Sequence, residues 1–331
     1  MAFKVPYIPT PQEIIDKAFS RAVKASPPKA RDPLKNKKNI AIVRIRTAQS
    51  VINSALTKIL ENYPDPRKMH KFYYELIEVS FGVHKIRRAL DRIKWGRRLI
   101  NKVADSLVEK IKMASDVKPI EKYRKTFYGR AASIIEDLED DLLTLKKGGA
   151  VISSLPTINP EEPTVVIAGY PNVGKSSLLK AISRAKPEIA QYPFTTKGIN
   201  VGHLKLGWRT IQVIDTPGLL DRPLEERNEI ELKAILALRY LATIIVFLID
   251  PTGHCGYPVE PQEKLLDEIK DTFSRIPIIE VETKSDITRR NNDRLKVSVV
   301  TGEGIDELLK RIEVILSGKK RKDLRDYPSP K

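Results

Sequence analysis

Hydrophobic residues recur three, four or seven positions apart along two long stretches of the N-terminal half of the chain. One stripe runs from Ile86 to Ile111, and another runs from Tyr123 to Leu145 and stops at Gly148-Gly149. This spacing places the apolar side chains on one face of a helix, so we expect amphipathic helices packed as an all-α bundle. Three pairs have the form of helix starts, at Thr10-Pro11, Asp32-Pro33 and Asp65-Pro66.

The pattern changes near residue 160, where short apolar runs alternate with helical stretches. Nearly continuous apolar runs are typical of strands buried on both faces of a parallel sheet. The runs occupy residues 164–168, 209–214, 243–249, 276–281 and 295–297, and helical stretches occupy 176–183 and 304–316. This alternation predicts an α/β domain with a mainly parallel sheet and helices on both faces.

A phosphate-binding sequence, Gly-x-x-x-x-Gly-Lys-Ser, lies at Gly169–Ser176 between a predicted strand and a predicted helix. Its glycines let backbone N–H groups curl around a phosphate, and the next helix points its positive end at the anion. We expect Lys175 to act as a catalytic residue on the β- and γ-phosphates and Ser176 to bind Mg²⁺. The predicted nucleotide contacts here are Gly169, Tyr170, Pro171, Asn172, Val173, Gly174, Lys175, Ser176 and Ser177.

Two further segments carry residues that a γ-phosphate sensor needs. Asp215, Thr216, Pro217 and Gly218 follow the predicted strand at 209–214. We expect Asp215 to hold Mg²⁺ through a water, and the catalytic Gly218 N–H to contact the γ-phosphate. Within YPFTTKG, at residues 192–198, we assign Thr196 as the catalytic switch threonine that also binds Mg²⁺, and Thr195 remains the alternative.

A guanine-binding sequence, Thr283-Lys284-Ser285-Asp286, follows the apolar run at 276–281. A carboxylate at Asp286 can accept hydrogen bonds from guanine N1–H and from the exocyclic amine, whereas adenine offers neither donor. We expect base contacts from Thr283, Lys284 and Asp286, and from a last loop formed by Ser298, Val299 and Val300. Four motifs in this order predict a P-loop GTPase domain that binds GTP and GDP.

Two residues depart from the common GTPase pattern. Thr283 stands where Asn is usual, and Leu219 stands where many GTPases place a water-orienting Gln. Because leucine cannot orient water, we expect slow hydrolysis until a partner or another device assists. Asn172 resembles the asparagine that helps to hold K⁺ in potassium-stimulated GTPases, which makes K⁺ a second candidate cation and Asn172 a candidate catalytic residue. A hydrogen bond within the loop is the alternative role for Asn172.

The net charge of +17 lies almost entirely in the first half of the chain. Residues 1–160 hold 32 Lys and Arg against 17 Asp and Glu, whereas residues 161–331 hold 27 against 25. Such an excess favours a polyanionic partner such as RNA, and a lysine-rich surface of a heat-adapted protein is the alternative. Arg87, Lys94, Arg98 and Lys102 fall on one predicted helix face. Aromatic residues 72–74 fit either stacking on bases or packing between helices.

Several segments together resemble the nucleolar GTP-binding (Nog-type) family of Obg-like GTPases. The segments are LPTINPEEPT, GYPNVGKSS, YPFTTKG, VGH and DTPGLLDRPLEERNEIE, with FYYELIEVSFGVHKIRRAL as a looser match at 72–90. The resemblance is densest over residues 155–255. It implies a helical-bundle domain before the GTPase domain and a role in large ribosomal subunit assembly, with ribosomal RNA as partner. Eukaryotic members continue well beyond the GTPase domain, so the chain looks like a short archaeal-type form.

We therefore predict an enzyme that hydrolyses GTP to GDP and phosphate as a switch in large ribosomal subunit assembly. The alternatives are a nucleotide-regulated RNA-binding scaffold with little hydrolysis, and a GTPase acting on tRNA or translation. The predicted parts are a basic helical bundle at 1–155, a linker at 156–162, the GTPase domain at 163–317 and a flexible basic tail at 318–331. One cysteine and no long apolar stretch indicate a cytoplasmic protein that does not enter a membrane. We expect a monomer.

Overall fold

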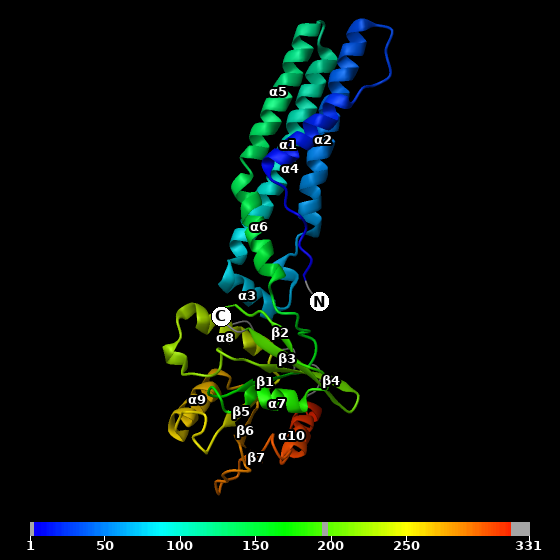
Figure 1. Cartoon of the computed structure of the whole chain (residues 1–331). Coiled ribbons are helices and arrows are strands. Elements are labelled where there is room, and N and C mark those ends of the chain that lie inside the picture. Colours follow the sequence, from blue (N-terminus) through cyan, green and yellow to red (C-terminus); the bar gives the residue numbers. More distant parts are fainter. Residues whose placement is uncertain (1–2, 194–197, 319–331) are drawn as a thin grey trace. The chain divides into compact units, whose positions relative to one another are not determined.

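The computed structural model describes residues 3–193 and 198–318 and separates them into two compact units. One unit contains residues 3–65 and 81–153, and the other contains residues 66–80 together with 154–193 and 198–318. The first is built of helices and the second is built around a sheet (Figure 1). Residues 66–80 thus group with the sheet although they lie within the N-terminal half of the chain. The predicted domain boundaries remain a prediction.

The helical unit is an all-α bundle, as the hydrophobic stripes predict. Its helices are α1 (Pro11–Lys24), α2 (Pro33–Asn62), α4 (Val83–Met113), α5 (Val117–Glu136) and α6 (Glu139–Ser153). The stripe on α4 is buried, with Ile86, Ile93 and Ile100 all at 0% exposure. Burying one apolar face per helix stabilises such a bundle more than helix propensity does.

Two of the predicted helix starts are confirmed by their capping bonds. Thr10 forms a capping box with Glu13, in which each side chain accepts from the other residue's backbone N–H. Asp32 accepts from the N–H groups of Leu34 and Lys35, both at 3.1 Å. At the third pair, Pro66 opens only a 3-10 turn, η1 (Pro66–Lys68), which belongs to the sheet unit.

The prediction of one helix ending at Gly148-Gly149 is wrong in two respects. The helix is interrupted between α5 and α6, where Leu138 is fully buried and packs on Gly96 of α4. α6 then continues through both glycines to Ser153. A Cβ on Gly148 would lie 3.0 Å from the Tyr63 hydroxyl, and one on Gly149 would lie 2.6 Å from Val5 Cγ1. These glycines therefore permit close packing rather than ending the helix.

The sheet unit has the predicted α/β architecture, a mainly parallel sheet with helices on both faces. The strand order is β2-β3-β4-β1-β5-β6-β7, and only the β2–β3 and β3–β4 pairs are antiparallel. Its strands are β1 (Thr164–Ala168), β2 (Glu188–Ala190), β3 (Ile199–Leu206), β4 (Arg209–Asp215), β5 (Ile244–Ile249), β6 (Ile278–Thr283) and β7 (Leu295–Val297). Its helices are α3 (Lys71–Ser80), α7 (Lys175–Ile182), α8 (Glu229–Ala237), α9 (Val259–Thr272) and α10 (Ile305–Gly318), with the 3-10 turns η2 (Leu224–Glu226) and η3 (Leu238–Tyr240).

Helix α3 is part of the core of the sheet unit and packs against α8. Phe72 is 0% exposed, and its ring lies 5.1 Å from that of Tyr73 and 6.3 Å from that of Tyr192. The Tyr73 hydroxyl donates to the carbonyls of Pro156 and Ile158, at 3.0 and 2.6 Å. Phe72 and Tyr73 therefore pack between elements, which excludes them as stacking platforms for bases.

A helix that spans a bilayer must be both long and predominantly apolar. No helix within residues 3–193 and 198–318 combines these two properties.

Candidate nucleotide-binding site

The predicted motifs converge at one edge of the sheet. β1, β4, β5, β6 and β7 run parallel through their pairings, and each is followed directly by a loop that carries polar residues. Ligands of open α/β sheets bind at the carboxyl ends of parallel strands. The loop at 169–174, the Asp215–Gly218 segment and the Thr283–Asp286 segment therefore belong to one site.

The phosphate loop has backbone conformations that require its sequence. Gly169 has φ +133°, and a Cβ there would lie 2.5 Å from the Leu248 carbonyl oxygen. Gly174, at φ +104°, precedes α7 as its N-cap. Asn172 also has a positive φ of 62°, a conformation that asparagine tolerates better than most residues. The loop is thus shaped to turn successive N–H groups toward an anion at the start of α7.

Lys175 is 7% exposed and lies across this loop. Its Nζ donates to the carbonyls of Gly169 and Tyr170 at 2.6 and 2.7 Å. Burial lowers the pKa of Lys175, while the nearby carboxylates of Asp221 and Asp215 oppose that change. The ammonium therefore lies at the phosphate loop with only neutral backbone carbonyls as hydrogen-bond partners.

Ser176 and Asp215 form a pair suited to Mg²⁺. The Ser176 hydroxyl donates to Asp215 Oδ2 at 2.5 Å, and Asn200 Nδ2 donates to the same oxygen at 3.0 Å. Asp215 is 0% exposed, and its Oδ1 has no hydrogen-bond partner among the described residues. A buried carboxylate oxygen without a partner, beside a hydroxyl, fits a hard cation that prefers oxygen ligands. The third predicted ligand, Thr196, and its alternative Thr195 lie outside the described residues.

The segment after Asp215 is closed by its own side chains. The Gly218 N–H donates to Asp221 Oδ2 at 2.7 Å. Arg227 donates to the carbonyls of Gly218 and Leu219, at 2.6 and 2.8 Å. Leu219 is 1% exposed, so this residue packs into the protein interior.

On the guanine side, the motif is braced while Asp286 stays exposed. The Thr283 hydroxyl donates to the Ile249 carbonyl at 3.2 Å, and Lys284 Nζ pairs with Asp250 at 2.6 Å. The Ser285 hydroxyl donates to Glu303 Oε2 at 2.8 Å. No hydrogen bond or ion pair within the described part of the chain engages the Asp286 carboxylate. Its acceptor oxygens are accordingly available to a base.

The last predicted loop is formed by a tight turn around Ser298. The Ser298 hydroxyl accepts from the Thr301 N–H at 3.2 Å, and the Ser298 N–H donates to the Glu303 carbonyl at 3.0 Å. Ser298 is buried, whereas Val300 is 87% exposed. Glu303 thereby connects this loop to Ser285 in the guanine motif.

Sequence reasoning missed Asp250, which follows β5 at the same sheet edge. Its carboxylate accepts from the Thr252 hydroxyl at 2.6 Å and the Cys255 N–H at 2.8 Å, as well as from Lys284. Burial opposes ionisation of Asp250, but the bonds from Lys284 and Thr252 outweigh it and lower the pKa of this carboxyl. The available signal was an Asp-Pro-Thr-Gly turn placed directly after a fully apolar strand.

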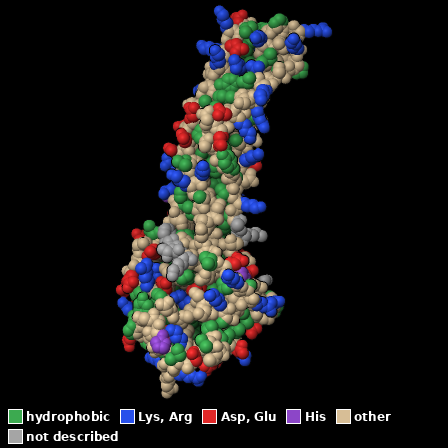
Figure 2. All heavy atoms as spheres, in the orientation of Figure 1, with side chains coloured by type: hydrophobic (Ala, Val, Ile, Leu, Met, Phe, Trp, Pro, Cys, Tyr) green, Lys and Arg blue, Asp and Glu red, His purple; other side chains and the backbone are tan. Residues whose placement is uncertain are grey.

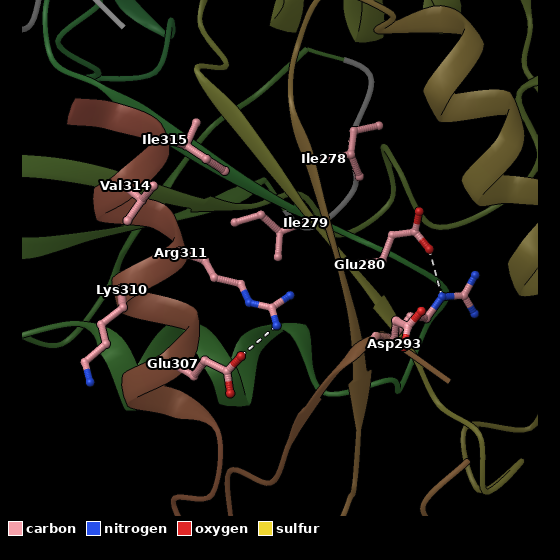
Figure 3. A pocket seen from close by; sticks show the side chains of 10 residues that line it. Ile278, Ile279, Glu280, Asp293, Glu307, Lys310, Arg311, Val314 and Ile315 are labelled. Carbon is pink, nitrogen blue, oxygen red and sulfur yellow. Dashed lines mark hydrogen bonds and ion pairs between the residues drawn. The ribbon is translucent and has the colours of Figure 1, made fainter. Parts of the chain in front are cut away.

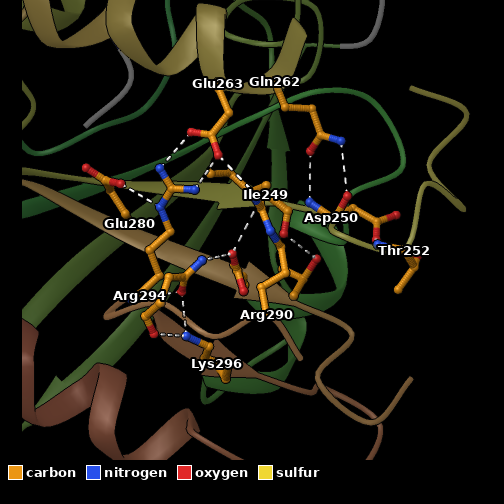
Figure 4. A network of polar contacts seen from close by, with 12 residues as sticks. Ile249, Asp250, Thr252, Gln262, Glu263, Glu280, Arg290, Arg294 and Lys296 are labelled. Carbon is orange, nitrogen blue, oxygen red and sulfur yellow. Dashed lines mark hydrogen bonds and ion pairs between the residues drawn. The ribbon is translucent and has the colours of Figure 1, made fainter. Parts of the chain in front are cut away.

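A second polar network holds the segment that follows the guanine motif (Figure 4). Arg294 forms two bonds to Glu263 of α9, at 2.5 and 2.6 Å, and one to Glu280 of β6 at 2.7 Å. Asn292 donates to the buried carboxylate of Glu282 at 2.6 Å. The bonds to Glu263 and Glu280 raise the pKa of Arg294 above its ordinary value. The segment that carries Asp286 is therefore anchored at its far end.

A hollow of about 630 Å³ lies away from these motifs, between α10 and β6. Ile278, Ile279, Val314 and Ile315 form its apolar wall, and Arg311 pairs with Glu307 at its rim (Figure 3). None of the predicted nucleotide contacts lines it, so the hollow is separate from the candidate site.

The order of these segments on the sheet is that of a P-loop GTPase domain. Comparison with known families agrees: residues 164–284 match the family described as 50S ribosome-binding GTPase, and residues 3–159 match the NOG1 N-terminal helical domain. An uncharacterized protein of Methanocaldococcus jannaschii is 42% identical over 88% of this chain and 82% of its own length. The chain belongs to the family of nucleolar GTP-binding protein 1.

Named members of this family are considerably longer. Nucleolar GTP-binding protein 1 of Drosophila melanogaster is 34% identical over 86% of this chain, and that of Arabidopsis thaliana is 31% identical over 87%. The alignments span 44% and 43% of those two proteins. This chain therefore corresponds to less than half of each.

Proposed function

We propose that this protein hydrolyses GTP and acts as a switch on the large ribosomal subunit or its precursor. The observation that carries the proposal is the convergence at one sheet edge of Lys175, the Ser176–Asp215 pair and the exposed carboxylate of Asp286. These groups serve the phosphates, a divalent cation and guanine respectively. A binding site for GTP needs all three.

In the proposed cycle, Lys175 exchanges its carbonyl partners for β- and γ-phosphate oxygens. Ser176 and Asp215 would hold Mg²⁺, which neutralises charge on the phosphates when bound. Asp286 accepts two hydrogen bonds from guanine, while Lys284, held by Asp250, keeps the motif in place. Thr196 is proposed to complete the cation's shell.

The proposed mechanism also needs a group that speeds hydrolysis. Leu219 is buried and carries no group that orients water. This observation favours a second function, a nucleotide-regulated RNA-binding scaffold with little hydrolysis. It also makes Asn172 relevant, because a K⁺ ion held beside the phosphates would stabilise developing charge as an arginine finger does.

We predict that K⁺ stimulates hydrolysis and that Asn172→Ala removes the stimulation. Asn172 is exposed on the loop, and no hydrogen bond within the described residues engages its side chain. Single-turnover rates in K⁺ and Na⁺ at matched ionic strength measure the effect. Asn172→Gly is the control for backbone conformation, because glycine keeps the positive φ and loses the amide. Equal rates in both salts would show that no such cation acts.

Two features support a ribosomal partner. The family matched by residues 164–284 is described as ribosome-binding, and the named relatives are nucleolar proteins. Lys and Arg side chains are spread along the face of the helical unit seen in Figure 2. A basic surface of this kind neutralises phosphates of RNA without reading its sequence.

The best candidate for an RNA-binding face lies on α4. It carries the exposed residues Arg87, Lys94, Arg98 and Lys102, none of which has an ion pair among the described residues. In contrast, Arg92 on the same helix pairs with Asp137 and Asp141. Asp91 lies among these unpaired cations. The face therefore carries a net positive charge but also contains one carboxylate.

We predict that reversing three of these charges, as Arg87→Glu, Lys94→Glu and Arg98→Glu together, weakens binding of the full chain to large-subunit RNA. The loss should be similar across RNA sequences, and the log-log slope of affinity against salt should become shallower. Filter binding over a salt series measures both. Lys310→Glu, at an exposed residue on α10, is the control for a single charge reversal outside the α4 face. Wild-type binding that ignores salt would contradict the assignment.

A further inference from the structure

The Asp221 carboxylate, three residues after the Asp215–Gly218 segment, takes the hydrogen bond that the proposed mechanism assigns to a phosphate. Gly218 has φ +80° and donates its N–H to Asp221 Oδ2 at 2.7 Å. The other carboxylate oxygen, Oδ1, accepts from Arg227 Nη2 at 3.0 Å. Both oxygens of Asp221 are thereby used within a single short loop.

Arg227 fastens this arrangement from inside the protein. Its side chain is only 2% exposed, and it donates to two backbone carbonyls of the loop as well as to Asp221. The Asp221 side chain is 15% exposed. A charge-assisted bond in a partly buried setting is among the stronger hydrogen bonds that a protein makes. Asp221 is therefore held firmly against Gly218.

The position of this carboxylate matters to the phosphate loop as well. Asp221 is the charged group that most opposes the burial-induced fall in the pKa of Lys175. The Leu220 carbonyl accepts from the Gly169 N–H at 3.0 Å, which joins the Asp221 segment to the start of the phosphate loop. A negative group thus already acts on both the lysine and the glycine that are assigned to the γ-phosphate.

We propose that Asp221 is an internal mimic of the γ-phosphate, which holds the Gly218 N–H until GTP displaces it and so sets the preference between GTP and GDP. This inference rests on the proposed function, in which Gly218 contacts the γ-phosphate. One N–H cannot serve two anionic acceptors at full strength, and two anions at one donor repel each other. GTP must therefore break the Asp221 bond, whereas GDP leaves it intact.

The test compares affinities of the full chain for fluorescently labelled GDP and a non-hydrolysable GTP analogue. Asp221→Asn removes the charge with little change in shape. It should tighten the GTP analogue roughly tenfold, which corresponds to losing one charge-assisted bond, and should leave GDP within about twofold. Glu225→Gln removes the same charge from an exposed neighbour that does not bond to Gly218, and it should leave both affinities unchanged.

Hydrogen exchange at the Gly218 amide supplies a second readout that general electrostatics would not produce. In the GDP complex, the amide should exchange slowly in the wild type and faster in Asp221→Asn. In the complex with the GTP analogue, the two proteins should protect it equally. If the two nucleotides shift together or not at all, and Gly218 exchange is unchanged, the mimic is refuted while GTP binding stands. If the wild type binds neither nucleotide, the proposed function fails as well.

Discussion

Asp286→Asn should change the base preference of this protein from guanine to xanthine. The asparagine amide keeps an acceptor for N1–H and presents a donor to the C2 carbonyl that xanthine has in place of the guanine amine. With guanine, the bond from the exocyclic amine to a charged acceptor is lost and two donors then face each other, at a combined cost of about 3 kcal/mol, so GTP affinity should fall by a factor on the order of 100. Affinity for xanthosine triphosphate should rise in the same variant.

The dissociation constants of both nucleotides, measured for wild type and variant, test this prediction. Asp293→Asn is the matched control, since Asp293 is an exposed carboxylate in the segment that follows the guanine motif. That control should retain the guanine preference. An unchanged preference in Asp286→Asn would show that the guanine motif has been misplaced and that another residue reads the base.

Phe72→Ala should destabilise the nucleotide-binding unit, although residue 72 is far from that unit in sequence. Phe72 is fully buried, and truncation of such a side chain costs about 3–5 kcal/mol. In urea, the transition reported by bound fluorescent nucleotide should move to lower denaturant. Phe127→Ala, equally buried in the helical unit, should instead move the transition of the helices. If Phe72→Ala shifts only that second transition, α3 does not belong to the nucleotide-binding unit.

Much of the fold could be predicted because the apolar patterns are strong. β1 and β7 match their predicted ranges, since a continuous apolar run has few alternatives to a buried strand. β2 was missed because it is short. β3 was missed because buried and more exposed residues are mixed along it, toward the edge of the sheet. The place of α3 could not be predicted at all. A helical stripe shows that a face is buried, but it does not show which partner covers that face.

The candidate site likewise contains features that the sequence indicates and features that only tertiary packing determines. The phosphate loop and the guanine motif could be located in the sequence because their chemistry depends on local spacing, and the nucleotide contacts assigned to them stay predictions. The partners of Gly218 and Lys284 could not be predicted, because they depend on how Asp221 and Asp250 are placed by the fold. Buried contacts of this kind are determined by tertiary packing rather than by local sequence.

Single-turnover hydrolysis, with and without purified large subunits, tests whether the protein is a GTP-hydrolysing switch that acts on the large ribosomal subunit. We expect slow release of phosphate by the protein alone and an acceleration on the order of 100-fold or more when subunits are added, because the buried Leu219 cannot orient water and another source must supply that group. Tight GTP binding with no phosphate release in either condition would contradict the switch and favour the scaffold.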